Sequence, residues 1–491
     1  MKPLKLILFF FLPLWCLANN AHVRNLELAE SNVLECDITW ENSWHYHDSI
    51  APFNHDALWV FCKGRRLDNQ QWESILFKSS GVEVNEILEA KVASSQIGVI
   101  VKRIQNGEGY IQTNFKAEVN VVDLAASYSE IRLFAIEMVY VNEGAFYVGD
   151  SISNHSLMIY GSGQPFYIDS ESSITVGQTS GQLYSNDDYV PFANIPSQYP
   201  KGYSAFYAMK YEISQQQYVD FLNTLTPIQQ QNRQINKAFQ SLCFSDEDHI
   251  EGERNFIKKI GNQFGCDAND NGIFGETDDG NNVACNFLTW GHITAYLDWS
   301  GLRPMTELEF EKASRGPEES EPLELVWGNA NVVNTLQAVL SANDKETILD
   351  TIPPGFGIAN FGYCLPSGPL RCGFAATATS TRVSSGATYY GLMEMSGNLW
   401  ELCVNVSEKG LRFGGEHGDG QLNDQGFANQ STWESVSGEG SGLRGGGWNS
   451  GILNGFRDLA ISDRFFAFLN GNNSARGTVG GRGVISKEMF E

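Results

Sequence analysis

Positive charge is scarce in this sequence. The 491 residues include 33 Lys and Arg against 58 Asp and Glu, which gives a formal charge of −25 at pH 7. Such a surface repels phosphate backbones and anionic lipid headgroups, so neither nucleic-acid binding nor electrostatic membrane docking is expected. The same charge favours cations such as calcium. With 42% hydrophobic and 12% aromatic residues, the chain can nonetheless bury large cores.

Long apolar runs are missing after the N-terminus. Residues 1–18 hold two lysines and then the apolar run Leu6–Leu17, which is followed by small residues. This is the pattern of a secretory signal peptide, and the run falls short of the ~20 residues that span a bilayer. We therefore expect cleavage after Ala18. The mature chain should have no membrane span and should reach the periplasm, the cell surface or the exterior.

No CxxC pair occurs, so a zinc ribbon or a thioredoxin-type redox site has no support. Export places the remaining cysteines in an oxidising compartment, where disulfides are permitted. By spacing alone, Cys36 could pair with Cys62, Cys266 with Cys285, and Cys364 with Cys372. Buried free thiols are the alternative. The cysteines of the mature chain are Cys36, Cys62, Cys243, Cys266, Cys285, Cys364, Cys372 and Cys403.

Residues 19–125 contain short runs in which apolar and polar residues alternate, broken by Gly, Asn and Asp. A period of two indicates half-buried strands, so this part of the chain is predicted to be an all-β sandwich domain. His45 and His47, two residues apart, could bind a metal from one face of a strand, although such histidines are more often surface polar residues. The alternating runs are 32–38, 57–61, 97–101 and 117–121.

From residue 126 onward the pattern becomes mixed, which indicates an α+β domain over 126–491. Runs at 134–141 and 144–149 predict two strands joined at a turn. Polar or Gly-rich stretches near 227–286 and 405–440 look like long loop insertions in this domain.

Two helices are indicated by their start signals. Ser214 followed by Gln217 forms a capping box, and so does Thr306 followed by Glu309. An apolar face at helical spacing follows the first box. Gly316, before a proline, is expected to end the second helix.

Several segments together resemble the formylglycine-generating-enzyme (sulfatase-modifying factor) superfamily in order and spacing, over roughly residues 130–491. The resemblance implies a C-type-lectin-like domain with long loops. The N-terminal part also resembles modules that precede this domain in secreted bacterial proteins, through 40–44 and 55–63. The matching segments of the larger domain are Glu137–Val141, Gly144–Gly149, Tyr211–Leu222, Gly301–Ala313, Trp327–Asn329, Gly391–Glu401 and Arg444–Trp448.

Enzymes of this superfamily oxidise a substrate cysteine with copper held by two cysteine thiolates. Matched to their motif, this chain has Ser450 and Gly455 at the two thiolate positions, and Gly447 replaces the motif's serine. Copper(I) selects soft thiolates, so no copper is expected. The histidine-rich iron motif of the sulfoxide-synthase branch is also absent. The resemblance therefore implies a member without catalytic residues, whose fold serves binding or scaffolding.

The resemblance also implies a structural calcium site. Its ligands would be the side chains of Glu394 and Glu401 and the carbonyls of Gly397 and Leu399. Oxygen-only ligation suits a hard cation. Alternatively, Glu401 pairs with an arginine such as Arg444.

A second calcium candidate comes from the residues themselves. The segment 267–272 follows the D-x-N-x-N-G start of a calcium loop. Its ligands would be Asp267, Asn269, Asn271 and Asp278. A metal-free turn rich in Asp and Asn is the alternative, because short motifs give false positives.

The loop 449–478 carries aromatic and apolar residues among Gly and Asn. In this fold the corresponding region forms an exposed ligand face, so the loop is expected to bind glycan or protein. Alternatively, its apolar residues alternate into the core. The expected ligand-binding surface consists of Trp448, Ser450, Phe465, Phe466 and Phe468.

The sequence thus favours an exported, non-catalytic binding or structural protein, stabilised by calcium in an envelope or extracellular assembly. It would contact protein partners or copies of itself. Components of the gliding and type IX secretion machinery resemble it in lacking the cysteine pair. The alternatives are a lectin-like receptor acting through the 449–478 loop, and a copper-dependent oxidase of protein cysteine.

Overall fold

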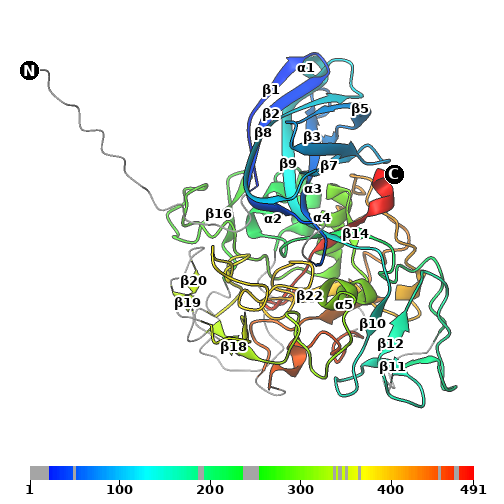
Figure 1. Ribbon diagram of the computed structural model, residues 1–491. Coiled ribbons are helices and arrows are strands. Elements are labelled where there is room, and N and C mark those ends of the chain that lie inside the picture. The colour runs from blue at the N-terminus through cyan, green and yellow to red at the C-terminus, as the bar shows by residue number, and fades with distance from the viewer. Residues whose placement is uncertain are drawn as a thin grey trace, which may run out of the picture.

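The computed structural model describes residues 21–47, 51–185, 193–235, 254–335, 339–340, 346–348, 352–362, 367–451, 455–468 and 475–491. The expected signal peptide and the cysteines Cys243 and Cys364 lie outside these residues, as do Ile452, Leu453 and Leu469 of the expected binding loop. Strands predominate over helices in the described part. Figure 1 shows a strand-rich N-terminal region standing on a larger body of loops and short elements.

A four-stranded antiparallel sheet forms one layer of the N-terminal region. Alternate residues of β2, such as Leu34, Ile38 and Trp40, are buried, as the period of two predicts. The predicted run 32–38 lies in β2 apart from its first residue, and the run 117–121 overlaps the last three residues of β8. In spatial order the strands are β1 (His22–Glu30), β2 (Val33–His45), β8 (Gly107–Val119) and β5 (Phe77–Glu83).

An eight-stranded sheet forms the second layer and continues into the rest of the molecule. Its strand β3 is buried on both faces, which explains its uninterrupted apolar run. Leu58 and Val60 share a core with β2 and β8, whereas Trp59 and Phe61 face the core of the larger domain. In spatial order the strands are β17 (Arg303–Pro304), β25 (Gly483–Ser486), β14 (Phe206–Met209), β9 (Tyr128–Val141), β3 (Asp56–Arg66), β7 (Gly98–Arg103) and β6 (Leu88–Val92), with β4 (Trp72–Ser74) paired to β3.

Strand β9 joins the N-terminal region to the larger body. It begins just after residue 125 and pairs along its length with β3, while its C-terminal end also pairs with β14. The strands expected at 134–141 and 144–149 both exist, as β9 and as β10 (Phe146–Val148). They do not pair with each other, because β10 pairs with β12 (Phe166–Ile168).

The larger body is held by small sheets between long loops. The expectation of an irregular insertion near 227–286 was wrong in part, since its described residues contain a helix and a hairpin. The described residues near 405–440 contain a short 3-10 helix, η3 (Gly410–Arg412). The small sheets are formed by β11 (Leu157–Ile159) with β13 (Leu183–Ser185), β15 (Ile257–Ile260) with β16 (Gln263–Cys266), β18 (Val332–Asn334) with β21 (Gly357–Ala359), β19 (Val339–Leu340) with β20 (Thr347–Ile348), and β23 (Ser441–Arg444) with β22 (Trp400–Val404) and β24 (Val479–Gly480).

Capping boxes open the longer helices. Those predicted at Ser214 and Thr306 are confirmed, and the second helix ends at Gly316 as expected. Thr226 and Thr289 open two further helices in the same way. The helices are α1 (Leu124–Ser127), α2 (Gln215–Leu222), α3 (Pro227–Arg233), α4 (Trp290–Ser300) and α5 (Glu307–Arg315), with 3-10 turns η4 (Gly455–Leu459) and η5 (Lys487–Phe490).

The C-terminus packs back against the N-terminal region. The Ser94 N–H donates to the Met489 carbonyl at 2.7 Å, and the Phe490 ring meets Trp59 edge-on at 6.0 Å. The red C-terminal turn in Figure 1 lies near β7. None of the helices in the described ranges is both long and apolar enough to cross a membrane.

Candidate functional site

The segment Gly445–Ser450 follows β23 and turns inward. Ser450 is buried, and its hydroxyl accepts a hydrogen bond from the Gly447 N–H at 3.0 Å. The Ser450 carbonyl accepts a further hydrogen bond from the Gly362 N–H at 2.8 Å. The side chain at the first thiolate position is thus part of a closed turn. Gly455, at the second position, has no side chain to offer a metal and begins η4.

Two described cysteines, Cys372 and Cys403 of β22, could in principle replace the missing thiolates. Cys372 lies in the small core that contains Trp448, and its thiol donates to the Glu212 carbonyl at 3.5 Å. Cys403 lies in a different core, where burial raises the pKa of its thiol well above the usual value. A neutral thiol is a poor copper ligand. The positions of these two cysteines therefore give no reason to expect a copper pair.

The segment Gly391–Glu401 makes a tight, strained turn before β22. Glu394 and Asn398 adopt positive φ angles of 58° and 65°, which residues with a side chain rarely do. Gly397, at φ 89°, lies against the Asn360 carbonyl, where a Cβ atom would approach the oxygen to 2.7 Å. Strained backbone of this kind gathers at ligand and active sites.

Glu401 is engaged by an arginine that the sequence did not single out. Arg482 donates from Nε and Nη2 to the Glu401 carboxylate at 2.7 to 3.0 Å. Its remaining N–H groups donate to carbonyls of Met209, Lys210 and Met393. The expected alternative, an arginine partner for Glu401, is therefore present, although the partner is Arg482.

Glu394 is buried beside this pair and is only half satisfied. Its Oε1 accepts from the Gly373 N–H at 2.9 Å, whereas its Oε2 has no hydrogen-bond partner among the described residues. Burial raises the pKa of Glu394 to about 7, against the lowering effects of the Gly373 N–H and of the arginines nearby. An uncompensated buried carboxylate oxygen is the feature that a cation would satisfy.

A third carboxylate, Glu212, completes the cluster. It follows β14 in the segment Tyr211–Leu222, where no motif predicts a role for it. Its Oε2 accepts from the Asn398 side chain at 2.5 Å and its Oε1 from the Leu399 N–H at 3.0 Å. Burial, with Glu401 and Glu394 nearby, raises its pKa well above the usual value. The excess of acidic groups over Arg482 fits a bound cation at Glu394.

The loop after β16 gathers the residues of the second calcium candidate. The Asp267 carboxylate accepts from the N–H groups of Asn271 and Gly272, at 3.0 and 3.2 Å, and from Lys258 Nζ at 3.1 Å. The side-chain amides of Asn269 and Asn271 both donate to Glu276, at 3.1 and 2.5 Å. Asn269, Asn271 and Asp278 thus lie together, but Asp267 is already paired with a lysine.

Within the described ranges, one group of three carboxylates is close enough to hold a metal ion together. One oxygen from each of Glu276, Asp278 and Asp279 lies within 4.8 Å of the others. Glu276 and Asp279 were missed from the sequence, because the loop motif assigns ligands by spacing alone.

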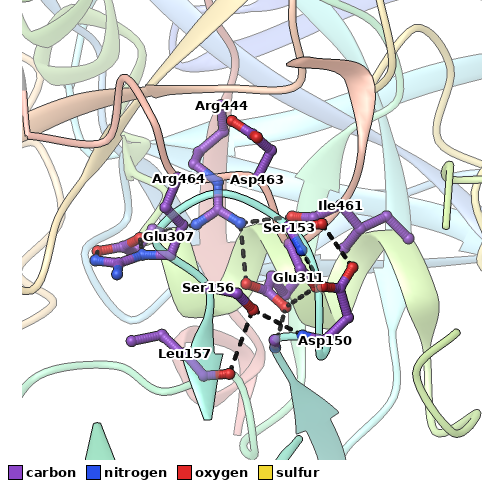
Figure 2. Close-up of polar contacts among 12 residues, drawn as sticks. Asp150, Ser153, Ser156, Leu157, Glu307, Glu311, Arg444, Ile461, Asp463 and Arg464 are labelled. Atoms are coloured by element: carbon purple, nitrogen blue, oxygen red, sulfur yellow. Dashed lines mark hydrogen bonds and ion pairs between the residues drawn. The ribbon is translucent and has the colours of Figure 1, made fainter. Parts of the chain in front are cut away.

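Helix α5 is clamped to the C-terminal segment by a buried ion network, which Figure 2 shows. Arg464 donates to both oxygens of Glu307 at 2.7 and 3.0 Å, and Arg444 bridges Glu307 and Glu311 at 2.8 and 2.9 Å. Glu311 also accepts from the Gly149 N–H at 2.8 Å. Gly149 must be glycine, because a Cβ there would meet the Leu157 carbonyl at 1.5 Å.

The structure corrects part of the expected ligand-binding surface. Trp448 and Ser450 are buried, and the Trp448 indole donates to the Gly477 carbonyl at 2.9 Å. Phe465 is 48% exposed and stacks edge-on against the half-buried Phe466 at 4.8 Å. Phe468, also half-buried, lies under the Arg464 guanidinium. Of the five residues, Phe465 is the one that is largely open to solvent.

The histidines of the N-terminal region stack rather than converge on one point. His45 and His55 are buried with ring centroids 5.2 Å apart, and His47 lies 4.6 Å from His45. Burial lowers the pKa of His55 well below its usual value, which keeps the ring neutral. The expectation that His45 is a surface loop residue was wrong, because it ends β2 inside this stack.

Comparison with known proteins gives a family and similar solved structures. No curated protein matches the chain. One of the similar solved structures is "Treponema denticola variable protein 1", at 11% sequence identity and a TM-score of 0.33, covering 72% of this chain and 96% of that one. A family model for the sulfatase-modifying factor enzyme 1-like domain matches residues 129–464. Because this match spans well over half of the sequence, the chain belongs to the sulfatase-modifying factor family, which includes the formylglycine-generating enzymes.

Proposed function

We propose that this protein is an exported, non-catalytic binding or structural component of an envelope or extracellular assembly. One observation carries the proposal: the family's two thiolate positions hold Ser450 and Gly455, and the Ser450 hydroxyl is hydrogen-bonded inside a buried turn. Soft copper ligation at these positions is therefore lost. Export rests on the signal peptide expected at residues 1–18.

The proposed scaffold is a C-type-lectin-like domain at 126–491, preceded by a β-sandwich domain at 19–125. It is supported by the continuous sheet through β9 and by the apolar core that the two N-terminal sheets share. Calcium, without copper, would stabilise the larger domain. The ligands would be Glu394 and Glu401 with the carbonyls of Gly397 and Leu399, as the orphaned Glu394 oxygen supports.

Protein partners or further copies of the chain would dock on its exposed apolar side chains. In the N-terminal region Tyr110 is 58% exposed and Val122 is 85% exposed. Tyr110 lies on β8, and Val122 follows the end of that strand. These residues favour a protein contact over nucleic acid, which the charge of −25 repels.

Chemical crosslinking on native cells, followed by purification and mass spectrometry, tests the assembly role. We expect crosslinks from residues 19–125 or from the 449–478 loop to envelope proteins or to other copies of this chain. Recovery as a freely released, uncrosslinked monomer would overturn the assembly proposal.

A second candidate is a lectin-like receptor that binds glycan or protein through the 449–478 loop. It is favoured by Phe465, whose exposed ring can stack on a sugar or on an apolar side chain. Glycan arrays probed with the wild type and with Phe465→Ala separate this function from a scaffold. Binding that disappears in the variant supports a receptor.

A further inference from the structure

The turn at residues 267–279 has an excess of acidic oxygens at one point. Glu276, Asp278 and Asp279 each place a carboxylate oxygen within 4.8 Å of the others. Lys258 Nζ donates hydrogen bonds to Asp267 and Asp270, at 3.1 and 2.5 Å. Its charge is thus directed away from the three-carboxylate group.

Asp279 provides an independent sign of a ligand. Its side chain is fully buried, and its Oδ2 accepts from the Glu276 N–H at 2.7 Å. Its Oδ1 is buried and finds no hydrogen-bond partner in the part of the chain that the structure describes. A buried carboxylate oxygen left unpaired costs free energy, which a cation bound among the three carboxylates would recover.

We propose that this turn is a calcium site whose anionic ligands are Glu276, Asp278 and Asp279. The Oδ1 atoms of Asn269 and Asn271 accept from the Asn271 and Ile273 N–H groups, at 3.1 and 2.7 Å, and hold the turn around Glu276, so water oxygens would complete the ligand set. The ligand set is oxygen-only, which excludes the nitrogen and sulfur donors that zinc prefers. An irregular turn of carboxylates and amides suits the large, flexible coordination of calcium better than the octahedron of magnesium.

The site would fasten the insertion to the core of the larger domain. The Ala268 N–H donates to the Asp279 carbonyl at 3.1 Å, which closes the turn. Just beyond it, the carbonyls of Asn281 and Val283 accept from the first N–H groups of α2, both at 2.9 Å. A cation that neutralises the three carboxylates would therefore also hold the segment whose carbonyls cap the start of α2. This inference is independent of the assembly role, since it concerns metal binding by the isolated chain.

Calorimetric titration of calcium into the EDTA-treated mature chain tests the site. Extracellular calcium modules bind with a Kd of about 10⁻⁴ to 10⁻³ M, and we expect this loop to fall in that range. Glu276→Gln and Asp278→Asn change partly exposed side chains, and each should weaken one binding event at least about tenfold. Asp270→Asn removes the same charge from the same turn without touching the three-carboxylate group, so its affinity should stay within about threefold of wild type. The Glu394→Gln variant should keep this event, which separates it from a site at Glu394.

Three results would overturn the proposal. The first is the absence of any calcium binding by the folded wild type. The second is wild-type affinity in both Glu276→Gln and Asp278→Asn. The third is an equal loss in Asp270→Asn, which would indicate diffuse attraction to an acidic surface. Circular dichroism of each variant confirms that it remains folded.

Discussion

Replacing Glu394 by glutamine removes the charge of this buried carboxyl and keeps its shape. In the wild type, the Gly373 N–H donates to Glu394 Oε1 at 2.9 Å. The Gln side chain keeps an oxygen for this hydrogen bond but cannot ionise. In the wild type, burial raises the pKa of Glu394 from 4.5 to about 7. At about 1.4 kcal/mol per pH unit, ionising Glu394 in the metal-free fold costs about 3 kcal/mol.

The sign of the effect follows from the raised pKa. Without metal, the folded protein holds the Glu394 proton more tightly than the unfolded chain does. The stability that comes from this proton is therefore fully present below pH 4.5 and is lost as the pH rises through about 7. At pH 8 in EDTA, Glu394→Gln should therefore be more stable than the wild type by about 3 kcal/mol, and at pH 4 the two should be nearly equal.

Calcium should narrow this difference. A cation at Glu394 stabilises the carboxylate, so millimolar calcium at pH 8 should raise the stability of the wild type and leave Glu394→Gln less affected. Below pH 7 the wild-type affinity should fall about tenfold per pH unit, because one proton competes with the metal.

Urea unfolding in EDTA and in calcium, at pH 4 and pH 8, measures these differences. Glu319→Gln, on an exposed side chain, serves as the matched control. A Glu394→Gln variant that is no more stable than the wild type at pH 8 in EDTA would refute the reasoning about the buried charge. Equal stabilisation of both proteins by calcium would refute the metal site.

Three further outcomes are expected. Arg464→Met removes the bidentate partner of Glu307 from a buried network, so it should lower the free energy of unfolding by about 3–5 kcal/mol. Arg412→Met, at an exposed ion pair, should change the free energy of unfolding by less than about 1 kcal/mol, and urea midpoints measure both effects. Burial, helped by Arg233, lowers the pKa of His292 to about 3, so the wild type should lose about 1.4 kcal/mol of unfolding free energy per pH unit from this group as the pH falls below 6.5. His292→Gln keeps a capping-box residue after Thr289, and its unfolding free energy, read from the same urea midpoints, should fall less steeply with falling pH. Phe465→Ala should leave stability within about 0.5 kcal/mol of wild type and should reduce crosslinks from the 449–478 loop on cells; crosslinks that persist unchanged would remove Phe465 from the contact surface.

The sequence predicted those elements that local signals specify. The Ser214 and Thr306 capping boxes located α2 and α5, alternation located β2 and β8, and short apolar runs located β3 and β7. Helix α4 was missed because His292 stands where the capping-box motif has Glu or Gln, although it accepts the same hydrogen bond, from the Thr289 N–H at 3.2 Å. Strand β9 pairs with β3, which lies far away in the sequence, so no local sequence pattern predicts this pairing.

The candidate sites were predictable only in part, for a similar reason. Motif spacing identified Glu394 and Glu401, but Arg482 and Glu212 reach them from distant segments of the chain. In the 267–279 turn, spacing favoured Asp267, whereas the fold pairs Asp267 with Lys258 and turns Glu276 inward. Trp448 was expected on the surface because the family resemblance implies an exposed ligand face in this region. Its indole instead donates to Gly477 in a closed core.

The central claim is that this family member works without the thiolate pair. Its most direct test is to incubate the purified mature chain with copper, oxygen and a Cys-x-Pro-x-Arg peptide, and to measure aldehyde by mass spectrometry. A family enzyme that retains both cysteines provides the positive control. The account predicts unchanged peptide cysteine with this chain, since Ser450 and Gly455 cannot supply thiolates. Aldehyde formed at a rate comparable to the control would contradict it.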